Sequence, residues 1–109
     1  LSVQSSGPGA PLGLPMKAQN FVSDGLSLLV NFSNSPNAPA VGTVGVQVSN
    51  DTVALTDPTH ARWVTLQTMN NLSADAFGSL TIPVYAVRLN CTAYTSGIIT
   101  LHIGIPDQL

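Results

Sequence analysis

The sequence predicts an all-β protein, a single β-sandwich or jelly-roll-like domain. Apolar residues recur at every second position over most of the chain, as they do in strands that bury one face. Turn-forming residues interrupt these stretches at intervals of about 8–12 residues, which is typical of sandwiches and barrels. The chain has 109 residues, of which 44 % are hydrophobic, so it suffices for one domain with one core.

Residues 1–15 are expected to form an extended N-terminal arm, and residues 16–109 the sandwich domain. Three prolines remove backbone donors from the arm and three glycines add conformational freedom, which excludes a helix there. Such an arm either hangs free or lies across a neighbouring subunit. Its candidate interface residues are Leu1, Val3, Pro11, Leu12, Leu14 and Pro15.

Two strands with clear alternation are expected after the arm. In residues 26–32 every second side chain is apolar, and in residues 43–49 valine alternates with smaller or polar residues. Residues 33–40 contain two prolines and two asparagines, so they form a loop. Asn50-Asp51 is a turn dipeptide that ends the second strand.

The middle of the chain has a weaker pattern. Residues 53–56 are expected to form a short strand, and residues 63–69 a strand of β-branched and apolar residues with imperfect alternation. Residues 70–78 form a polar connection, with one helical turn at residues 73–77.

Alternation returns towards the end of the chain. Leu80, Ile82 and Val84 share an apolar face, but Pro83 cannot donate to a ladder, so this piece belongs at a sheet edge or a bulge. Residues 85–91 and 99–105 alternate strictly, and residues 95–97 are expected to join these strands as a hairpin. The pattern leaves jelly-roll and immunoglobulin-like topologies open.

Charged residues make up only 7 % of the chain, whereas an average globular protein contains about 25 %. Two interpretations fit this deficit. Either neutral hydroxyl and amide groups solvate the surface, or other subunits cover much of it, since interface cores are depleted in charge. We favour assembly with other subunits.

The low charge also excludes classes of partner. A net charge of −2 with three basic residues does not suit electrostatic binding of nucleic acid. No apolar stretch approaches the length of about 18 residues that a membrane-spanning helix needs. We therefore expect neither nucleic acid nor a membrane as a partner. Arg62 and Arg88 are further candidate interface residues, and each is expected to pair with an Asp within the fold or across a contact.

The residues that could carry chemistry are few and scattered. Cys91 is the only cysteine and lies on the apolar face of its expected strand, so we expect it to be buried. His60 and His102 belong to separate elements, whereas a zinc site needs three or four ligands. Glu is absent and the Asp residues lie in different turns, so no carboxylate pair is expected. The sequence thus predicts no catalytic residue, no metal site and no cofactor.

Four segments together resemble a known class of proteins. They are VQVSNDT at 46–52, ARWVTL at 61–66, YAVRL at 85–89 and TSGIITLHI at 95–103. In this order they resemble small β-sandwich proteins of tailed bacteriophage virions, including capsid decoration (cement) proteins and fibre domains. The resemblance covers roughly Val44 to Ile105. Thr52 stands where a glycine is usual, and Pro83 is an addition.

This resemblance implies a non-enzymatic structural protein on the capsid exterior of a bacteriophage virion. Its partners would be the major capsid protein and further copies of itself, in a trimer or dimer. The arm would contact the capsid or a neighbouring subunit. The alternative is a receptor- or carbohydrate-binding β-sandwich domain of a phage fibre or adhesin, which exposed aromatic residues clustered at one end of the sandwich would favour.

Overall fold

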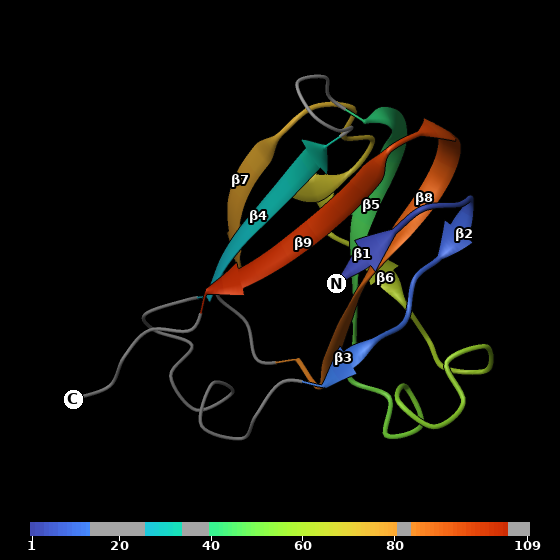
Figure 1. The fold of residues 1–109 in the computed structure, drawn as a ribbon. Coiled ribbons are helices and arrows are strands. Elements are labelled where there is room, and N and C mark those ends of the chain that lie inside the picture. Colours follow the sequence, from blue (N-terminus) through green and yellow to red (C-terminus); the bar gives the residue numbers. More distant parts are fainter. Residues whose placement is uncertain (14–25, 34–39, 81–83, 105–109) are drawn as a thin grey trace.

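The computed structural model describes residues 1–13, 26–33, 40–80 and 84–104. Its strands form two antiparallel sheets that pack against each other, so the predicted all-β sandwich is confirmed (Figure 1). In the described part of the chain, no helix has the length and hydropathy that crossing a membrane requires.

The first sheet has the strand order β1-β9-β4-β7. Its strands are β1 (Ser2–Val3), β4 (Leu26–Ser33), β7 (Ala76–Leu80) and β9 (Ile98–Gly104). The long ladder joins β4 to β9, where the register pairs Val30 with Leu101. The last strand in sequence therefore lies inside the sheet, between β1 and β4.

The second sheet has the strand order β2-β8-β5-β6, and β3 also pairs with β8. Its strands are β2 (Gly7–Pro8), β3 (Leu12–Gly13), β5 (Val41–Ser49), β6 (Val64–Thr65) and β8 (Ala86–Ser96). The ladder between β5 and β8 extends over the whole of β5, with register shifts near its start. It pairs Gln47 with Arg88, which positions both side chains for the site described below.

The connection from β8 to β9 passes from one sheet to the other. The hairpin predicted at residues 95–97 is therefore wrong, although the turn is in the expected place. Gly97 has φ +88°, and a Cβ on it would lie 2.7 Å from the carbonyl oxygen of Ser33. Only glycine fits this corner without strain. It directs β9 to β4 in the opposite sheet instead of back along β8.

The expected N-terminal arm is built into the sandwich of its own chain over residues 1–13. β1 pairs with β9, whereas β2 and β3 pair with β8, so this segment crosses from one sheet to the other (Figure 1). The amino group of Leu1 donates to the carbonyl oxygen of Leu101 at 3.2 Å, and the Leu101 N–H donates to the carbonyl oxygen of Leu1 at 2.7 Å. Leu14, Pro15 and the expected boundary after residue 15 lie outside the described residues.

The strand predicted at residues 53–56 is absent, and these residues form turns. The carboxylate of Asp51 accepts a hydrogen bond from the N–H of Val53 at 3.2 Å, and the N–H of Asp57 donates to the carbonyl oxygen of Val53 at 2.7 Å. These local bonds satisfy the backbone without a partner strand, because an Asp side chain competes with sheet pairing for nearby N–H groups.

Two further predictions in the middle of the chain need correction. The strand predicted at residues 63–69 is limited to β6, and a short 3₁₀ helix, η1 (Gln67–Met69), follows it. The helical turn predicted at residues 73–77 is replaced by the start of β7, because Ala76 and Phe77 pair with β4. Residues 81–83, which include the expected edge proline Pro83, lie outside the described part of the chain.

The core lies between the sheets and takes side chains from both inner faces. Its buried members include Val3, Leu28, Val30, Phe32, Val44, Val46, Met69, Val87, Leu89, Cys91, Ile99 and Leu101. Cys91 is 2 % exposed, so its predicted burial is confirmed. Met69 of η1 packs on β7, where a Cβ at Gly78 would lie 2.5 Å from its Sδ. Glycine at that position therefore allows the close packing of η1 on the first sheet.

Candidate functional site

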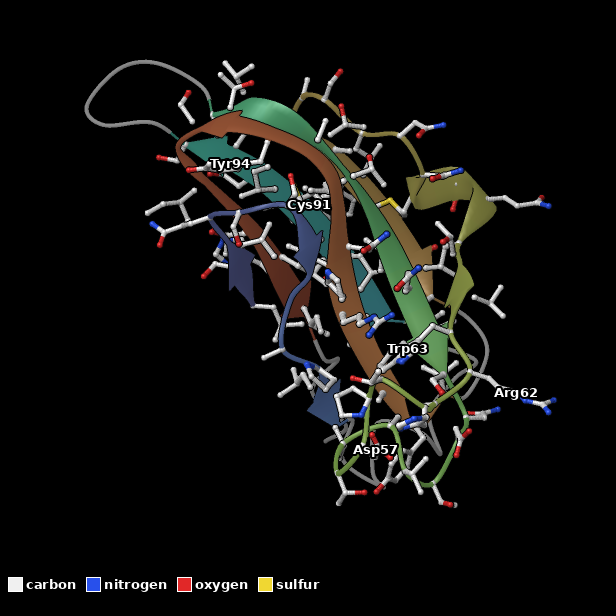
Figure 2. All side chains as sticks on the ribbon, turned by 90° about the vertical axis from the view of Figure 1, so that its right-hand side faces the viewer. Asp57, Arg62, Trp63, Cys91 and Tyr94 are labelled. Atoms are coloured by element: carbon white, nitrogen blue, oxygen red, sulfur yellow. The ribbon has the colours of Figure 1, made fainter. Side chains whose placement is uncertain are left out.

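A groove on the outer face of the second sheet contains two of the predicted interface residues, Pro11 and Arg88. We call it the Trp63 groove, and its volume is about 720 Å³. It is lined by Pro8, Gly9, Ala10 and Pro11 of the arm, Gln47 and Arg88 of the sheet, and Pro58, Thr59, Ala61 and Trp63 of the segment before β6. Residues far apart in the sequence therefore contribute to one site (Figure 2).

Arg88 is held in this groove by two neighbours. Its Nε–H donates to Oε1 of Gln47 at 2.8 Å, and its guanidinium carbon lies 4.1 Å from the centroid of the Trp63 ring. The indole N–H of Trp63 donates to the carbonyl oxygen of Pro58 at 3.0 Å, which fixes the ring. A guanidinium over an indole face gains a cation–π attraction. These two contacts thus fix the position of the guanidinium.

Within the described part of the fold, Arg88 has no Asp partner and its hydrogen-bond partner is Gln47, while its pairing with an Asp across a contact stays a prediction. The register of the sheet explains this difference, because β5 presents an amide rather than a carboxylate beside Arg88. Asp57, in the loop beside the groove, is bonded to Nδ1 of His60 at 2.8 Å. Burial lowers the pKa of the Arg88 guanidinium, but an arginine remains protonated under all ordinary conditions. The groove therefore holds a cation, and its described lining residues include no compensating carboxylate.

The structure does not bring Arg62 to the Trp63 groove. Its backbone N–H donates to Oδ2 of Asp51 at 3.4 Å, and its side chain is exposed and points away from the sheet (Figure 2). Arg62 lines a separate cavity of about 490 Å³ together with Val64 and Val84. The two arginines predicted at an interface thus belong to different surfaces.

The other predicted interface residues in the described part of the arm differ in exposure. Val3 is 6 % exposed and belongs to the core, so its side chain is not available to a partner. Leu1 is partly buried against the same core, whereas Leu12 is 43 % exposed. The physical reason is the pairing of β1 with β9, which turns the Val3 side chain inward.

The outer face of the first sheet is a second candidate surface, which we call the neutral face. Its outward side chains are Ser2, Ser27, Leu29, Asn31, Ser33, Phe77, Ser79, Ile98, Thr100 and His102. The four strands of this sheet contain no Asp, Glu, Lys or Arg. Phe77 is 73 % exposed, and the register places it beside Leu29, which is in turn beside His102.

Sequence reasoning missed Phe77 as a surface residue because it assigned residues 73–77 to a helical turn. In β7 the exposed Phe77 and Ser79 alternate with less exposed residues, and Leu80 is buried. This period of two could have indicated a strand that directs one apolar residue, Phe77, outward. Whether Phe77 is exposed depends on which other elements cover the sheet, and the local sequence pattern carries no information about them.

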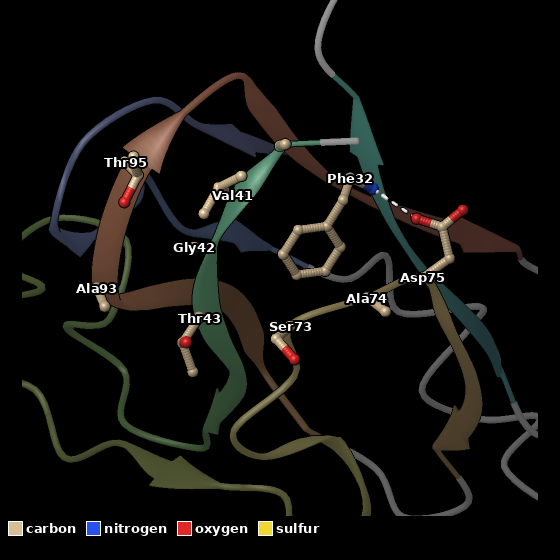
Figure 3. A pocket seen from close by; sticks show the side chains of 10 residues that line it. Phe32, Val41, Gly42, Thr43, Ser73, Ala74, Asp75, Ala93 and Thr95 are labelled. Atoms are coloured by element: carbon tan, nitrogen blue, oxygen red, sulfur yellow. Dashed lines mark hydrogen bonds between the residues drawn. The ribbon is translucent and has the colours of Figure 1, made fainter. Parts of the chain in front are cut away.

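A cleft of about 870 Å³ opens at one end of the sandwich (Figure 3). Among the described residues of its lining Asp75 alone is ionisable, and its Oδ1 accepts a hydrogen bond from the N–H of Phe32 at 2.7 Å. This carboxylate therefore links the start of β7 to β4. The described residues of the lining thus supply no pair of groups for proton transfer.

The remaining residues of chemical interest are dispersed. His60 lies in an exposed loop, His102 lies on the neutral face, and the Sγ of Cys91 contacts the carbonyl oxygen of Ala93 at 3.1 Å in the interior. The part of the chain that the structure describes contains no group of three or more His, Cys, Asp or Glu residues that could hold a metal ion.

The aromatic side chains of the described residues are likewise distributed over the molecule. Trp63 lies under Arg88, the Tyr94 hydroxyl donates to the carbonyl oxygen of Gly97 at 2.8 Å, and Phe77 lies on the opposite sheet. Phe77 is the one exposed aromatic side chain among the described residues, since Phe32 is buried and Trp63, Tyr85 and Tyr94 are partly buried, so they form no exposed cluster at one end of the sandwich. Comparison with known proteins found no matching family model, no matching curated protein and no matching solved structure.

Proposed function

We propose that this protein is a non-enzymatic structural component of a tailed-bacteriophage virion, which decorates or cements the capsid through subunit–subunit contacts. The observation that carries the proposal is the neutral face. An isolated soluble domain normally keeps its surface charged, whereas the cores of protein interfaces are depleted in charge. The virion setting rests on the resemblance of the four sequence segments.

Among the outward side chains of the neutral face, Phe77 would contribute the most binding free energy when a partner covers it. Burying the exposed part of a phenylalanine contributes about 2 kcal/mol, or about thirtyfold in an association constant, before the costs of association. Leu29 lies beside it, and the serine and threonine side chains around both can form hydrogen bonds without the cost of burying a charge. At the edge of the face, the side-chain amide of Asn31 donates to Oδ2 of Asp75 at 3.4 Å.

The proposed partners are further copies of this chain, in a dimer or trimer, and the major capsid protein on the exterior of the shell. The fibre or adhesin alternative, which would bind a receptor or carbohydrate, was expected to show exposed aromatic residues at one end. The described aromatic residues are dispersed, so we prefer assembly to this alternative.

The experiment compares the Phe77→Ser variant with a matched control, Val64→Ser. Val64 is 67 % exposed but lies on β6 at the edge of the other sheet. Native mass spectrometry measures the oligomer, and co-sedimentation with shells of the major capsid protein from the same phage measures decoration. We expect the wild type and Val64→Ser to form a discrete dimer or trimer and bind shells, and Phe77→Ser to lose at least tenfold in binding. Unchanged assembly and shell binding by Phe77→Ser would contradict the proposal. A wild-type protein that is monomeric and does not bind the shells would also contradict it.

A further inference from the structure

We propose that the Trp63 groove binds a carboxylate side chain, presented by an extended peptide segment of a partner protein. The identity of the partner as a protein rests on the proposed function. The binding of the carboxylate rests on the groove itself and can be tested without a capsid.

The groove is formed before any ligand arrives. On one side, the N–H of Gly9 donates to the carbonyl oxygen of Leu89 at 2.8 Å, and the pairing of β2 and β3 with β8 fixes the arm on both sides of this bond. On the other side, Pro58 holds the Trp63 ring. A preformed site avoids the entropy cost of ordering its walls on binding. Its volume of about 720 Å³ lies in the range of about 300–1,000 Å³ found for ligand sites.

Arg88 presents the recognition chemistry. Its Nε–H already donates to Gln47, and its guanidinium carbon lies over the Trp63 ring. The described residues supply no partner for the two terminal amino groups, which leaves the end of the planar fork for a ligand. Two parallel N–H donors match the two oxygens of a carboxylate, and such bidentate pairs are the strongest hydrogen bonds that an arginine forms.

The surroundings favour one carboxylate over a polyanion. Arg88 is the only charged residue among those that the structure describes in the lining of the groove, and the chain has a net charge of −2. Nucleic acids and other polyanions require several cations along their path. Three prolines, two alanines and the indole supply apolar walls instead. This combination suits a single Asp or Glu side chain with small apolar neighbours.

Trp63 is the only tryptophan of the chain, so its fluorescence reports on the groove directly. The probes are two blocked pentapeptides, acetyl-Ala-Pro-Glu-Pro-Ala-amide and the same peptide with Gln in place of Glu. We expect a saturable change in fluorescence with the Glu peptide and at least tenfold weaker binding of the Gln peptide. Equal binding of the two peptides, or no saturable change with either, would overturn the proposal, and neither result depends on the folding of a variant.

Variants then assign the binding to Arg88. Arg88→Gln should lose the response to the Glu peptide, while Arg62→Gln, which removes a cation outside the groove, should retain it. Arg88→Lys should bind at least threefold more weakly than the wild type, because an ammonium lacks the planar fork. A folded Arg88→Gln variant that binds the Glu peptide normally would refute the site. A stronger response to inorganic phosphate than to the Glu peptide would overturn the assignment to a peptide carboxylate.

The two proposals fail separately in these experiments. Phe77→Ser should bind the Glu peptide as the wild type does, because Phe77 lies on the other sheet. Arg88→Gln should keep the oligomer that the neutral face forms. Loss of peptide binding in Arg88→Gln with an intact oligomer would therefore support the groove on its own, whatever the outcome with capsid shells.

Discussion

Replacing Gly97 by alanine tests the corner at which the chain passes from β8 to β9. This glycine has φ +88°, where a residue with a Cβ is strained. The new methyl group would lie 2.6 Å from the Cβ of Ala40 and 2.7 Å from the carbonyl oxygen of Ser33. Because the second contact is with backbone, no side-chain rotation relieves it.

The expected loss of stability has two parts. The positive φ costs about 1–2 kcal/mol for a residue with a Cβ. Displacing the neighbouring backbone and Ala40 adds a cost comparable to overpacking a core, about 1–3 kcal/mol. We therefore expect Gly97→Ala to lower the free energy of unfolding by about 3 kcal/mol. With a urea m-value of about 1.5 kcal/mol/M, the unfolding midpoint falls by about 2 M.

Gly7 provides a matched control within the same chain. Its φ is +108°, but a Cβ there would meet no atom within 4 Å. Gly7→Ala therefore carries the backbone cost alone, about 1–2 kcal/mol. Urea unfolding followed by circular dichroism measures both variants. The reasoning about the corner is refuted if Gly97→Ala is no less stable than Gly7→Ala.

Three further outcomes follow from the burial of particular side chains. Val87→Asp should fail to fold because it buries a carboxylate in the core, whereas Asn90→Asp on the outward face of the same strand should fold. Circular dichroism distinguishes the two outcomes, and a folded Val87→Asp variant would show that the strand register is wrong. Val3→Ala should lower the free energy of unfolding by about 1–2 kcal/mol in urea titrations, and an unchanged midpoint would mean that β1 does not pack on the core. The Cys91 thiol should react with Ellman's reagent at least a hundredfold more slowly in the native protein than in denaturant, and rapid native labelling would contradict its burial.

The long strands could be predicted from the sequence because their alternation is local. The residues that alternate at 26–32, 43–49, 85–91 and 99–105 lie largely within β4, β5, β8 and β9. The choice of partner strand could not be predicted in the same way. A turn signal at Gly97 shows that the chain reverses, but only the contacts with Ser33 and Ala40, distant in sequence, determine which sheet the next strand joins.

The candidate site was accessible to sequence reasoning only in part. A chain with few charges makes each arginine conspicuous, and Arg88 does lie in a groove with Pro11. Its partners Gln47 and Trp63 come from other elements, so no spacing in the sequence connects them. The arm residue Val3 was expected at an interface because a glycine- and proline-rich segment has no internal pattern. Its burial follows from pairing with β9 at the far end of the chain.

The position of β9 between β1 and β4 has a consequence for the synthesis of this protein. During synthesis, β1 and the edge of β4 that pairs with β9 have no partner until residues 98–104 emerge. The first sheet therefore cannot be completed before β9 has been made, although β4 can already pair with β7 and β5 with β8. The dominance of pairings between distant residues makes folding slow. During that interval the apolar face of β4 is open to other nascent chains, so rapid translation through the C-terminal strand should reduce aggregation in the cell.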